Sequence, residues 1–310
     1  MQFDLTILGS NSALPAVGRN PSSQVLQYDS TAYLIDCGEG TQVQLHRYKI
    51  RRGRIKNIFI SHLHGDHYYG LIGLITSYSL YKREDALNIY GPAGIEKIVN
   101  LQLELSGARL GFPLNFIHVD GNRHSLIMED KNFKVYSIPL SHRIECNGFL
   151  FEEKIGRRRL TPELLKKFQV PVDQMNALKD GADLIRDDGT VIPNQEVTED
   201  PFPIRKYAYC SDTAYDERII PIIDGVDLLY HESTFAESEK QRAQETRHST
   251  AKEAGLIAKK AKVGKLILGH FSSRYSDLTV LQNEAKEVFS DTFLGEEGSV
   301  FEVDRKDHLR

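Results

Sequence analysis

The chain has 310 residues, of which 40% are hydrophobic and 26% are charged, and this ordinary globular composition excludes a disordered or fibrous protein. Its 39 Lys and Arg residues against 43 Asp and Glu residues give a formal net charge of −4, so bulk charge does not indicate a nucleic-acid binder and leaves room only for a local basic patch. No signal-peptide pattern opens the chain, and no run of about 18 apolar residues predicts a membrane span. The three cysteines, Cys37, Cys146 and Cys210, are widely spaced, which favours free thiols and a cytoplasmic location.

Short apolar runs that end at turn residues predict buried strands along most of the chain. In chain order they cover residues 3–8, 32–36, 55–60, 87–90, 133–138, 206–210, 228–230 and 266–268. Residues 93–103, 250–261 and 278–289 have apolar positions at helical spacing. Strands and helices are therefore intermixed, which predicts a layered α/β fold.

The stretch 152–203 differs from its surroundings. It contains five prolines and many charges, with little sustained alternation of apolar and polar residues. We interpret it as an excursion from the core that holds a helix and a small hairpin around Asp187-Asp188-Gly189. Its beginning is basic, with Arg157, Arg158 and Arg159 in a row. A solvated charged face and a nucleic-acid contact both fit that pattern.

The run 55–60 is followed by the pattern His-x-His-x-Asp-His, formed by His62, His64, Asp66 and His67. In an extended segment, residues two apart point to one side, so His62 and His64 can converge on one ion. A turn at Gly65 would let Asp66 and His67 face a second ion, the arrangement that two-metal hydrolysis uses. Imidazole and carboxylate ligands without thiolates suit Zn²⁺, Mn²⁺ or Fe²⁺, and zinc is the default.

Two ions need more ligands than these four side chains supply. Further candidates follow other predicted strands: His142 comes after 133–138, Asp212 after 206–210 and His270 after 266–268. Strand ends meet at one edge of a sheet, so we expect these residues to complete the metal centre.

This set of residues resembles the metallo-β-lactamase superfamily. The match is closest to the ribonuclease Z family, whose members are endonucleases that trim the 3′ end of precursor tRNA. The resemblance extends over further stretches, which are 9–15 with Arg19-Asn20, 36–42, 59–74, 90–92, 211–213, 231–235, 247–250 and 270–275. It covers nearly the whole chain outside 152–203.

The resemblance implies a metallo-β-lactamase fold, an αββα four-layer sandwich that forms one domain over residues 1–310 with an inserted, projecting arm. In that family an arm at this place in the chain clamps tRNA, so residues 152–203 are a candidate tRNA-binding exosite, with Arg157, Arg158 and Arg159 as candidate contacts. The family's Gly-Pro motif is missing here, which predicts a shorter or differently shaped arm. The family also implies a homodimer.

The resemblance further implies a role for each site residue. Two zinc ions per chain would be held by seven ligands: His62, His64 and His142 on one ion, Asp66, His67 and His270 on the other, and Asp212 between them. Asp66 would orient the attacking water and accept its proton. His248, held by Glu232, would protonate the departing 3′ oxygen. Arg274 and the loop from Ser10 to Asn20 would bind phosphates.

Two other functions remain open. The first is a hydrolase of the same fold that acts on small phosphodiesters or esters without a tRNA role, which the metal ligands alone do not exclude. The second is an inactive scaffold that has kept the fold and serves as an RNA-binding or assembly module. A scaffold would be expected to lack some ligands, and all seven positions are filled here.

Overall fold

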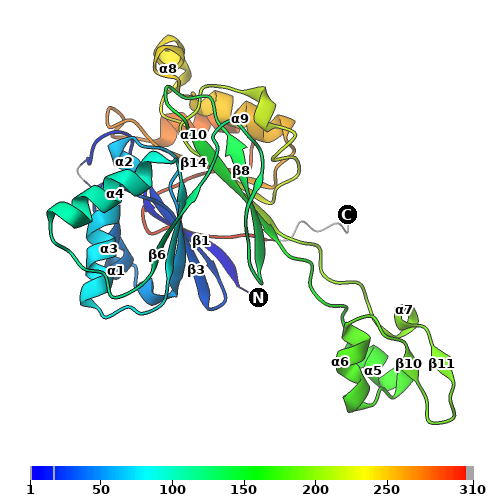
Figure 1. Cartoon of the computed structure of the whole chain (residues 1–310). Helices are drawn as coiled ribbons and strands as arrows, with labels where there is room; N and C mark the ends of the chain where they lie inside the picture. Colours follow the sequence, from blue (N-terminus) through cyan, green and yellow to red (C-terminus); the bar gives the residue numbers. More distant parts are fainter. Residues whose placement is uncertain (1, 17, 305–310) are drawn as a thin grey trace. The chain divides into compact units, whose positions relative to one another are not determined.

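The computed structural model describes residues 2–16 and 18–304, which form two compact units (Figure 1). The larger unit comprises the chain up to Glu152 and from Arg205 onward, and the smaller unit comprises Glu153–Ile204. Among the described residues, no helix is long and apolar enough to cross a membrane.

The larger unit contains two seven-stranded sheets. The first has the order β16-β1-β2-β3-β4-β5-β6 and is antiparallel from β16 to β3 and parallel from β3 to β6. Its strands are β1 (Phe3–Gly9), β2 (Ser23–Tyr28), β3 (Thr31–Cys37), β4 (Ile55–Phe59), β5 (Leu87–Gly91), β6 (Leu114–His118) and β16 (Val300–Glu302).

The second sheet has the order β15-β14-β13-β12-β9-β8-β7, with parallel pairing from β12 to β15 and antiparallel pairing of β12 with β9 and of β8 with β7. Its strands are β7 (Leu126–Glu129), β8 (Phe133–Pro139), β9 (Asn147–Glu153), β12 (Lys206–Cys210), β13 (Leu228–Glu232), β14 (Lys265–Gly269) and β15 (Thr292–Leu294). Several strands that run parallel therefore end at the same edge, and the site lies there.

Helices cover the outer face of each sheet. Those on the first sheet are α1 (Thr41–Arg47), α3 (Leu71–Leu80) and α4 (Gly94–Leu105), and those on the second are α9 (Ala251–Lys260) and α10 (Thr279–Lys286). The one-turn helix α2 (Gly65–Tyr68) precedes α3, and α8 (Lys240–Thr246) projects away from the second sheet (Figure 1). Short 3₁₀ turns are η1 (Arg52–Arg54), η3 (Glu217–Ile219) and η4 (Glu237–Glu239). Thr250 begins α9 with a capping box, in which it exchanges hydrogen bonds with Glu253.

The core has three apolar layers, one under each set of helices and one between the sheets. The middle layer is rich in aromatic side chains, among them Phe59, Phe149, Phe151 and Tyr207, whose rings meet edge-on or tilted. This arrangement confirms the predicted αββα sandwich. The prediction missed β2, β6, β7, β9, β15 and β16. Three of them, β7, β15 and β16, are short strands at or near sheet edges, where polar residues interrupt the apolar pattern.

The smaller unit is inserted between β9 and β12. It contains α5 (Pro162–Phe168), η2 (Val172–Gln174), α6 (Met175–Lys179), the hairpin β10 (Leu184–Ile185) and β11 (Val191–Ile192), and α7 (Asn194–Val197). The hairpin turns around Asp187-Asp188-Gly189 as predicted, with Gly189 in the left-handed region (φ 83°). The single helix predicted here is instead three short ones. They pack on a small core of Val170, Leu178, Leu184 and Val197.

Candidate metal centre and active site

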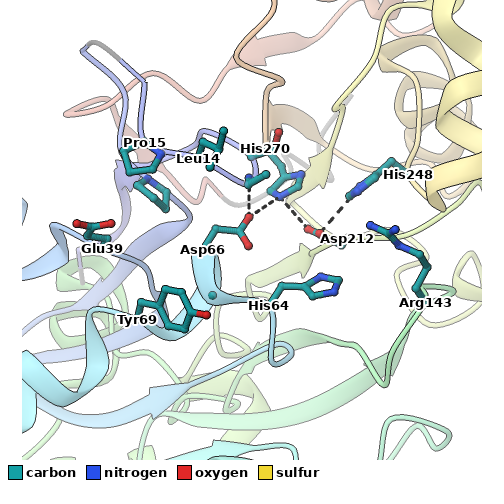
Figure 2. A pocket seen from close by; sticks show the side chains of 14 residues that line it. Leu14, Pro15, Glu39, His64, Asp66, Tyr69, Arg143, Asp212, His248 and His270 are labelled. Atoms are coloured by element: carbon teal, nitrogen blue, oxygen red, sulfur yellow. Dashed lines mark hydrogen bonds and ion pairs between the residues drawn. The ribbon is translucent and has the colours of Figure 1, made fainter.

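All seven predicted metal ligands meet at one edge of the two sheets. His62 and His64 follow β4, and Asp66 and His67 lie on α2, which starts immediately after them. The other three follow strands of the second sheet, with His142 after β8, Asp212 after β12 and His270 after β14. The strand ends predicted from the sequence thus converge on one centre (Figure 2).

One group of ligand atoms comes from His62, His64, His142 and Asp212, and all of them lie within 4.8 Å of one another. Nδ1 of His64 is 3.0 Å from Nε2 of His62 and 3.2 Å from Nε2 of His142. Oδ2 of Asp212 is 3.5 Å from Nε2 of His62. Three imidazole nitrogens and one carboxylate oxygen therefore face a single point.

A second group comes from Asp66, His67 and His270. Oδ2 of Asp66 is 3.4 Å from Nε2 of both histidines. The other oxygen of Asp212, Oδ1, is 3.4 Å from Nε2 of His67 and 3.1 Å from Nε2 of His270. Each Asp212 oxygen thus faces one group, which is the position of a bridging ligand.

Hydrogen bonds outside these groups orient two of the histidines. Nδ1 of His67 donates to Oδ2 of Asp36 at 2.7 Å, and Nδ1 of His142 donates to the carbonyl oxygen of Arg247 at 2.9 Å. Carboxylate and carbonyl oxygens only accept, so Nδ1 of each ring carries a proton and Nε2 is the nitrogen that faces the centre. Such second contacts orient metal ligands.

The residues present fit two divalent cations. Nε2 of His67 and Oδ1 of Asp212 are buried without a hydrogen-bond partner among the described residues, and such atoms are costly unless something binds them. Burial lowers the pKa of His62, which favours the neutral imidazole that a ligand needs. At His67 burial acts in the same direction, but Asp66 and Asp212 outweigh it and raise the pKa, so the centre favours positive charge.

The predicted pair of His248 and Glu232 lies beside the centre. Nδ1 of His248 donates to Oε1 of Glu232 at 2.8 Å, and that oxygen also accepts from the backbone N–H of Thr213 at 2.9 Å. Burial lowers the pKa of His248, but the Glu232 carboxylate outweighs it and raises this pKa to about 9. Glu232 is fully buried and holds the ring by one nitrogen, which leaves Nε2 for the pocket.

Thr234 joins this pair to the metal ligands. Its hydroxyl donates to Oε2 of Glu232 at 2.7 Å and accepts from Nδ1 of His270 at 2.9 Å. Since the carboxylate only accepts, the hydroxyl proton is committed to Glu232, and His270 must donate through Nδ1. One side chain therefore orients both Glu232 and His270.

The loop between Ser10 and Asn20 contacts the centre through its backbone. The N–H of Ala13 donates to Oδ2 of Asp66 at 2.8 Å. Ala13 adopts the left-handed region (φ 58°), which an alanine takes up only at a cost. The sequence predicted phosphate contacts for this loop, and the structure shows in addition that it positions Asp66.

A pocket of about 460 Å³ opens onto the centre. His64, Asp66, Asp212, His248 and His270 line its floor. Figure 2 shows Arg143 on the same side as His248, and Tyr69, Pro15 and Glu39 on the other side of Asp66. The pocket therefore combines a polar, metal-binding floor with two unlike walls.

The predicted phosphate-binding arginines are engaged with carboxylates. Arg274 pairs with Glu239 at 2.6 Å and lies over the ring of Phe235, and it does not line the pocket. In the smaller unit the three predicted tRNA contacts each pair with an acidic residue of the same unit: Arg157 with Asp180, Arg158 with Asp200 and Arg159 with Glu199. Their contact with RNA stays a prediction.

Three residues of the site did not follow from the sequence. Asp36 and Thr234 act through hydrogen bonds that only the folded chain forms, although both lie in stretches that carry the family resemblance. Arg143 lines the pocket and directly follows the ligand His142, and this adjacency is the signal that could have identified it.

Comparisons with known proteins agree with this geometry. The model of a family described as Anti-Pycsar protein Apyc1 matches residues 3–155. Ribonuclease Z of Parabacteroides distasonis is 49% identical to this chain, and the match covers 96% of this chain and 97% of that protein. Ribonuclease Z of Porphyromonas gingivalis is 46% identical, and the match covers 95% of this chain and 97% of that protein. The crystal structure of the short form of human tRNase Z has a TM-score of 0.71 at 28% identity and covers 97% of this chain and 100% of that one. The metallo-β-lactamase fold protein YhfI of Bacillus subtilis shares the fold, with a TM-score of 0.70 at 21% identity. That match covers 97% of this chain and 100% of YhfI.

Proposed function

The chain belongs to the ribonuclease Z family, and from this premise we propose that it is the endoribonuclease that removes the 3′ trailer from precursor tRNA. The observation that carries the proposal is the bridging position of Asp212 between two ligand groups, beside the pair of His248 and Glu232. Two adjacent cation sites stabilise the attacking and leaving oxygens of a phosphodiester, and a proton donor assists the leaving oxygen.

We propose that the two sites hold Zn²⁺. The donors are imidazole nitrogens and carboxylate oxygens, which zinc accepts readily, and Mn²⁺ and Fe²⁺ share this preference. When bound, the two ions would make a water molecule more acidic and neutralise charge on the phosphoryl oxygens. His62, His64 and His142 would hold one ion, Asp66, His67 and His270 the other, and Asp212 both.

The chain's own residues supply orientation and proton transfer. Asp66, held by the N–H of Ala13, would orient the attacking water and accept its proton. As the water oxygen bonds to phosphorus, the bond from phosphorus to the 3′ oxygen breaks, and Nε2 of His248 gives its proton to that oxygen. Glu232 supports this step because it keeps His248 charged and fixed. The products are a tRNA with a 3′ hydroxyl and a trailer with a 5′ phosphate.

Arg143 is the best-placed phosphate contact. Among the described residues that line the pocket it is the only Lys or Arg, and it lies next to His248 in Figure 2. Its side chain is exposed, and no hydrogen bond or ion pair of its guanidinium is found in the described part of the chain. A planar guanidinium binds phosphate oxygens with two parallel hydrogen bonds. Arg274 and the arm would bind RNA further from the scissile bond.

A homodimer and a cytoplasmic location complete the proposal. Leu80 and Tyr81 at the end of α3 and Leu101 and Leu105 in α4 are exposed apolar side chains, which suit burial against a second copy. Light scattering tests that association.

The cysteines bear on the proposed location. Cys37, Cys146 and Cys210 are buried free thiols, as expected in a reducing compartment.

The test is incubation of the zinc-loaded protein with an end-labelled precursor tRNA that carries a 3′ trailer. We expect one cut at the junction, with a 3′ hydroxyl and a 5′ phosphate on the products, and loss of that cut in Asp66→Ala. Hydrolysis of small phosphodiesters without cleavage of precursor tRNA would overturn the tRNA role but not the metal centre. Binding of much less than two ions per chain would overturn the metal centre itself.

A further inference from the structure

Tyr69 is a large side chain that stays exposed at the rim of the active-site pocket. Its exposed fraction is 65%, although it lies only three residues from the ligand Asp66 and lines the same pocket. An exposed aromatic ring next to a binding site offers apolar area that a ligand can cover.

The ring of Tyr69 is held in place on the protein side. A Cβ atom on Gly65 would lie 2.1 Å from the Tyr69 ring, so the ring rests directly on the backbone of that glycine. The next residue, Gly70, donates its N–H to the carbonyl oxygen of Cys37 at 2.9 Å, and a Cβ there would lie 2.1 Å from the carbonyl oxygen of Gly38. A side chain at position 70 would therefore clash with the backbone, and a side chain at position 65 would displace the Tyr69 ring. The ring of Tyr69 thus packs against the backbone of Gly65 and against the ring of Tyr68, with 5.0 Å between the two ring centres, and most of its surface is open.

The place of Tyr69 defines which part of a substrate it can reach. His248 donates to the departing 3′ oxygen, so the nucleotide upstream of the cut lies on the side of His248 and Arg143. Figure 2 shows Tyr69 on the opposite side of Asp66, together with Pro15. In an in-line displacement the attacking water lies opposite the departing 3′ oxygen, while the downstream nucleotide stays bonded to phosphorus through its 5′ oxygen and so extends to a side other than that of the departing oxygen.

We infer that Tyr69 is a stacking platform for the base of the first trailer nucleotide, the one that carries the 5′ phosphate after cleavage. This inference rests on the proposed function and adds to it a subsite for unpaired RNA. Enzymes and binding proteins hold unpaired bases by stacking on aromatic rings. Every base has a π face, so the contact would tolerate any trailer sequence.

The test combines substitutions of Tyr69 with a missing base. Wild type, Tyr69→Phe and Tyr69→Leu cleave precursor tRNA with a normal or an abasic first trailer nucleotide. We expect Tyr69→Leu to reduce kcat/KM for the normal substrate by about ten- to a hundredfold, because stacking contributes that much per base. The same variant should differ little from wild type on the abasic substrate, and Tyr69→Phe should behave as wild type. An equal loss on both substrates would overturn the inference.

A second readout identifies the nucleotide and separates this inference from the proposed function. 2-Aminopurine replaces the first trailer base, or the last base before the cut, in RNA bound to His248→Ala. Quenching at the trailer position that disappears in the His248→Ala, Tyr69→Leu double variant supports the subsite, and quenching dependent on Tyr69 only at the upstream position overturns it. If wild type leaves the normal substrate uncut, the proposed function fails. If it cuts that substrate but neither readout depends on Tyr69, only the subsite fails.

Discussion

The metal centre and the inserted unit are built in contrasting ways. At the centre, ligands are held twice: His67 by Asp36, His142 by the backbone of Arg247 and His270 by Thr234, all within a core that three apolar layers fill. The inserted unit, Glu153–Ile204, has one small apolar core, and its arginines bind exposed acids of the same unit. Side chains of the candidate metal centre are thus each oriented by a second contact. The surface ion pairs of the inserted unit, in contrast, contribute little to its stability.

The charge of the inserted unit sharpens the contrast. It holds eight Lys and Arg residues against ten Asp and Glu residues, so it is not basic as a whole. Lys166 and Lys167 on α5 are exposed, and no ion pair of either is found among the described residues. Neither lysine has to break an ion pair before it binds a phosphate, so these two suit that role better than the paired Arg157, Arg158 and Arg159, although the ammonium of Lys167 lies 4.8 Å from the ring centre of Phe168.

The largest effect is expected where one residue serves both ligand groups. Asp212→Ala should lower cleavage more than about a thousandfold and reduce the metal content below two ions per chain, because both groups lose an oxygen. Metal analysis and cleavage of precursor tRNA measure this. Asp216→Ala, which removes a carboxylate paired with Arg218 outside the site, is the control and should keep both ions. Full metal content in Asp212→Ala would contradict the bridging assignment.

A smaller loss is expected when only the proton donor is removed. His248→Ala should lower kcat by about a hundredfold to ten-thousandfold, as loss of a general acid does, and keep two metal ions. Glu232→Gln should act in the same direction, since an amide does not hold the charged ring of His248. His118→Ala, at an exposed histidine of β6, is the control and should retain full activity. Substantial metal loss in His248→Ala would show that the ring is a ligand and not a donor.

The rigidity of the centre can be tested through a residue that touches no substrate. Thr234→Val keeps the shape of the side chain but removes the hydroxyl that links Glu232 and His270. We expect metal affinity or activity to fall about ten- to a hundredfold, and Thr234→Ser to restore most of it. Metal competition with a chelator and kcat measure the two effects. If Thr234→Val matches wild type in both, the centre does not depend on its second contacts.

The candidate metal ligands that the sequence predicts do come together in the structure, because the pattern that identifies them is local in the chain. His62, His64, Asp66 and His67 are nearly adjacent in the chain, and the three later ligands each follow an apolar run that could be recognised as a strand. Strand ends that meet at one edge then bring them together.

Contacts between distant parts of the chain could not be predicted in this way. Oδ2 of Asp36 accepts from Ser61 and from Tyr209, which lies on the other sheet, and only the packing of the two sheets brings these partners together. The same holds for the inserted unit. In the sequence its three consecutive arginines indicate a basic patch. Their acidic partners, such as Asp180 and Glu199, lie far along the chain, so the sequence alone did not show that the arginines are paired.

The smallest effect is expected in the inserted unit, and it decides which of its charges meet RNA. The double substitution Lys166→Ala, Lys167→Ala should weaken precursor tRNA binding and reduce the slope of log affinity against log salt by about two, since each lysine that binds a phosphate contributes about one. Hydrolysis of a small phosphodiester should not change. Binding measured across a salt series tests this.

Arg157→Gln is the matched control for that experiment. Its guanidinium already pairs with Asp180, so its removal should leave the salt slope nearly unchanged and cost little stability. If Arg157→Gln flattens the slope as much as the lysine double variant does, the ion pair opens when RNA binds. The paired arginines would then be the RNA contacts, and the inserted unit would exchange its internal ion pairs for contacts with phosphates. The hydrogen bonds that orient the metal ligands would, in contrast, stay in place when RNA binds.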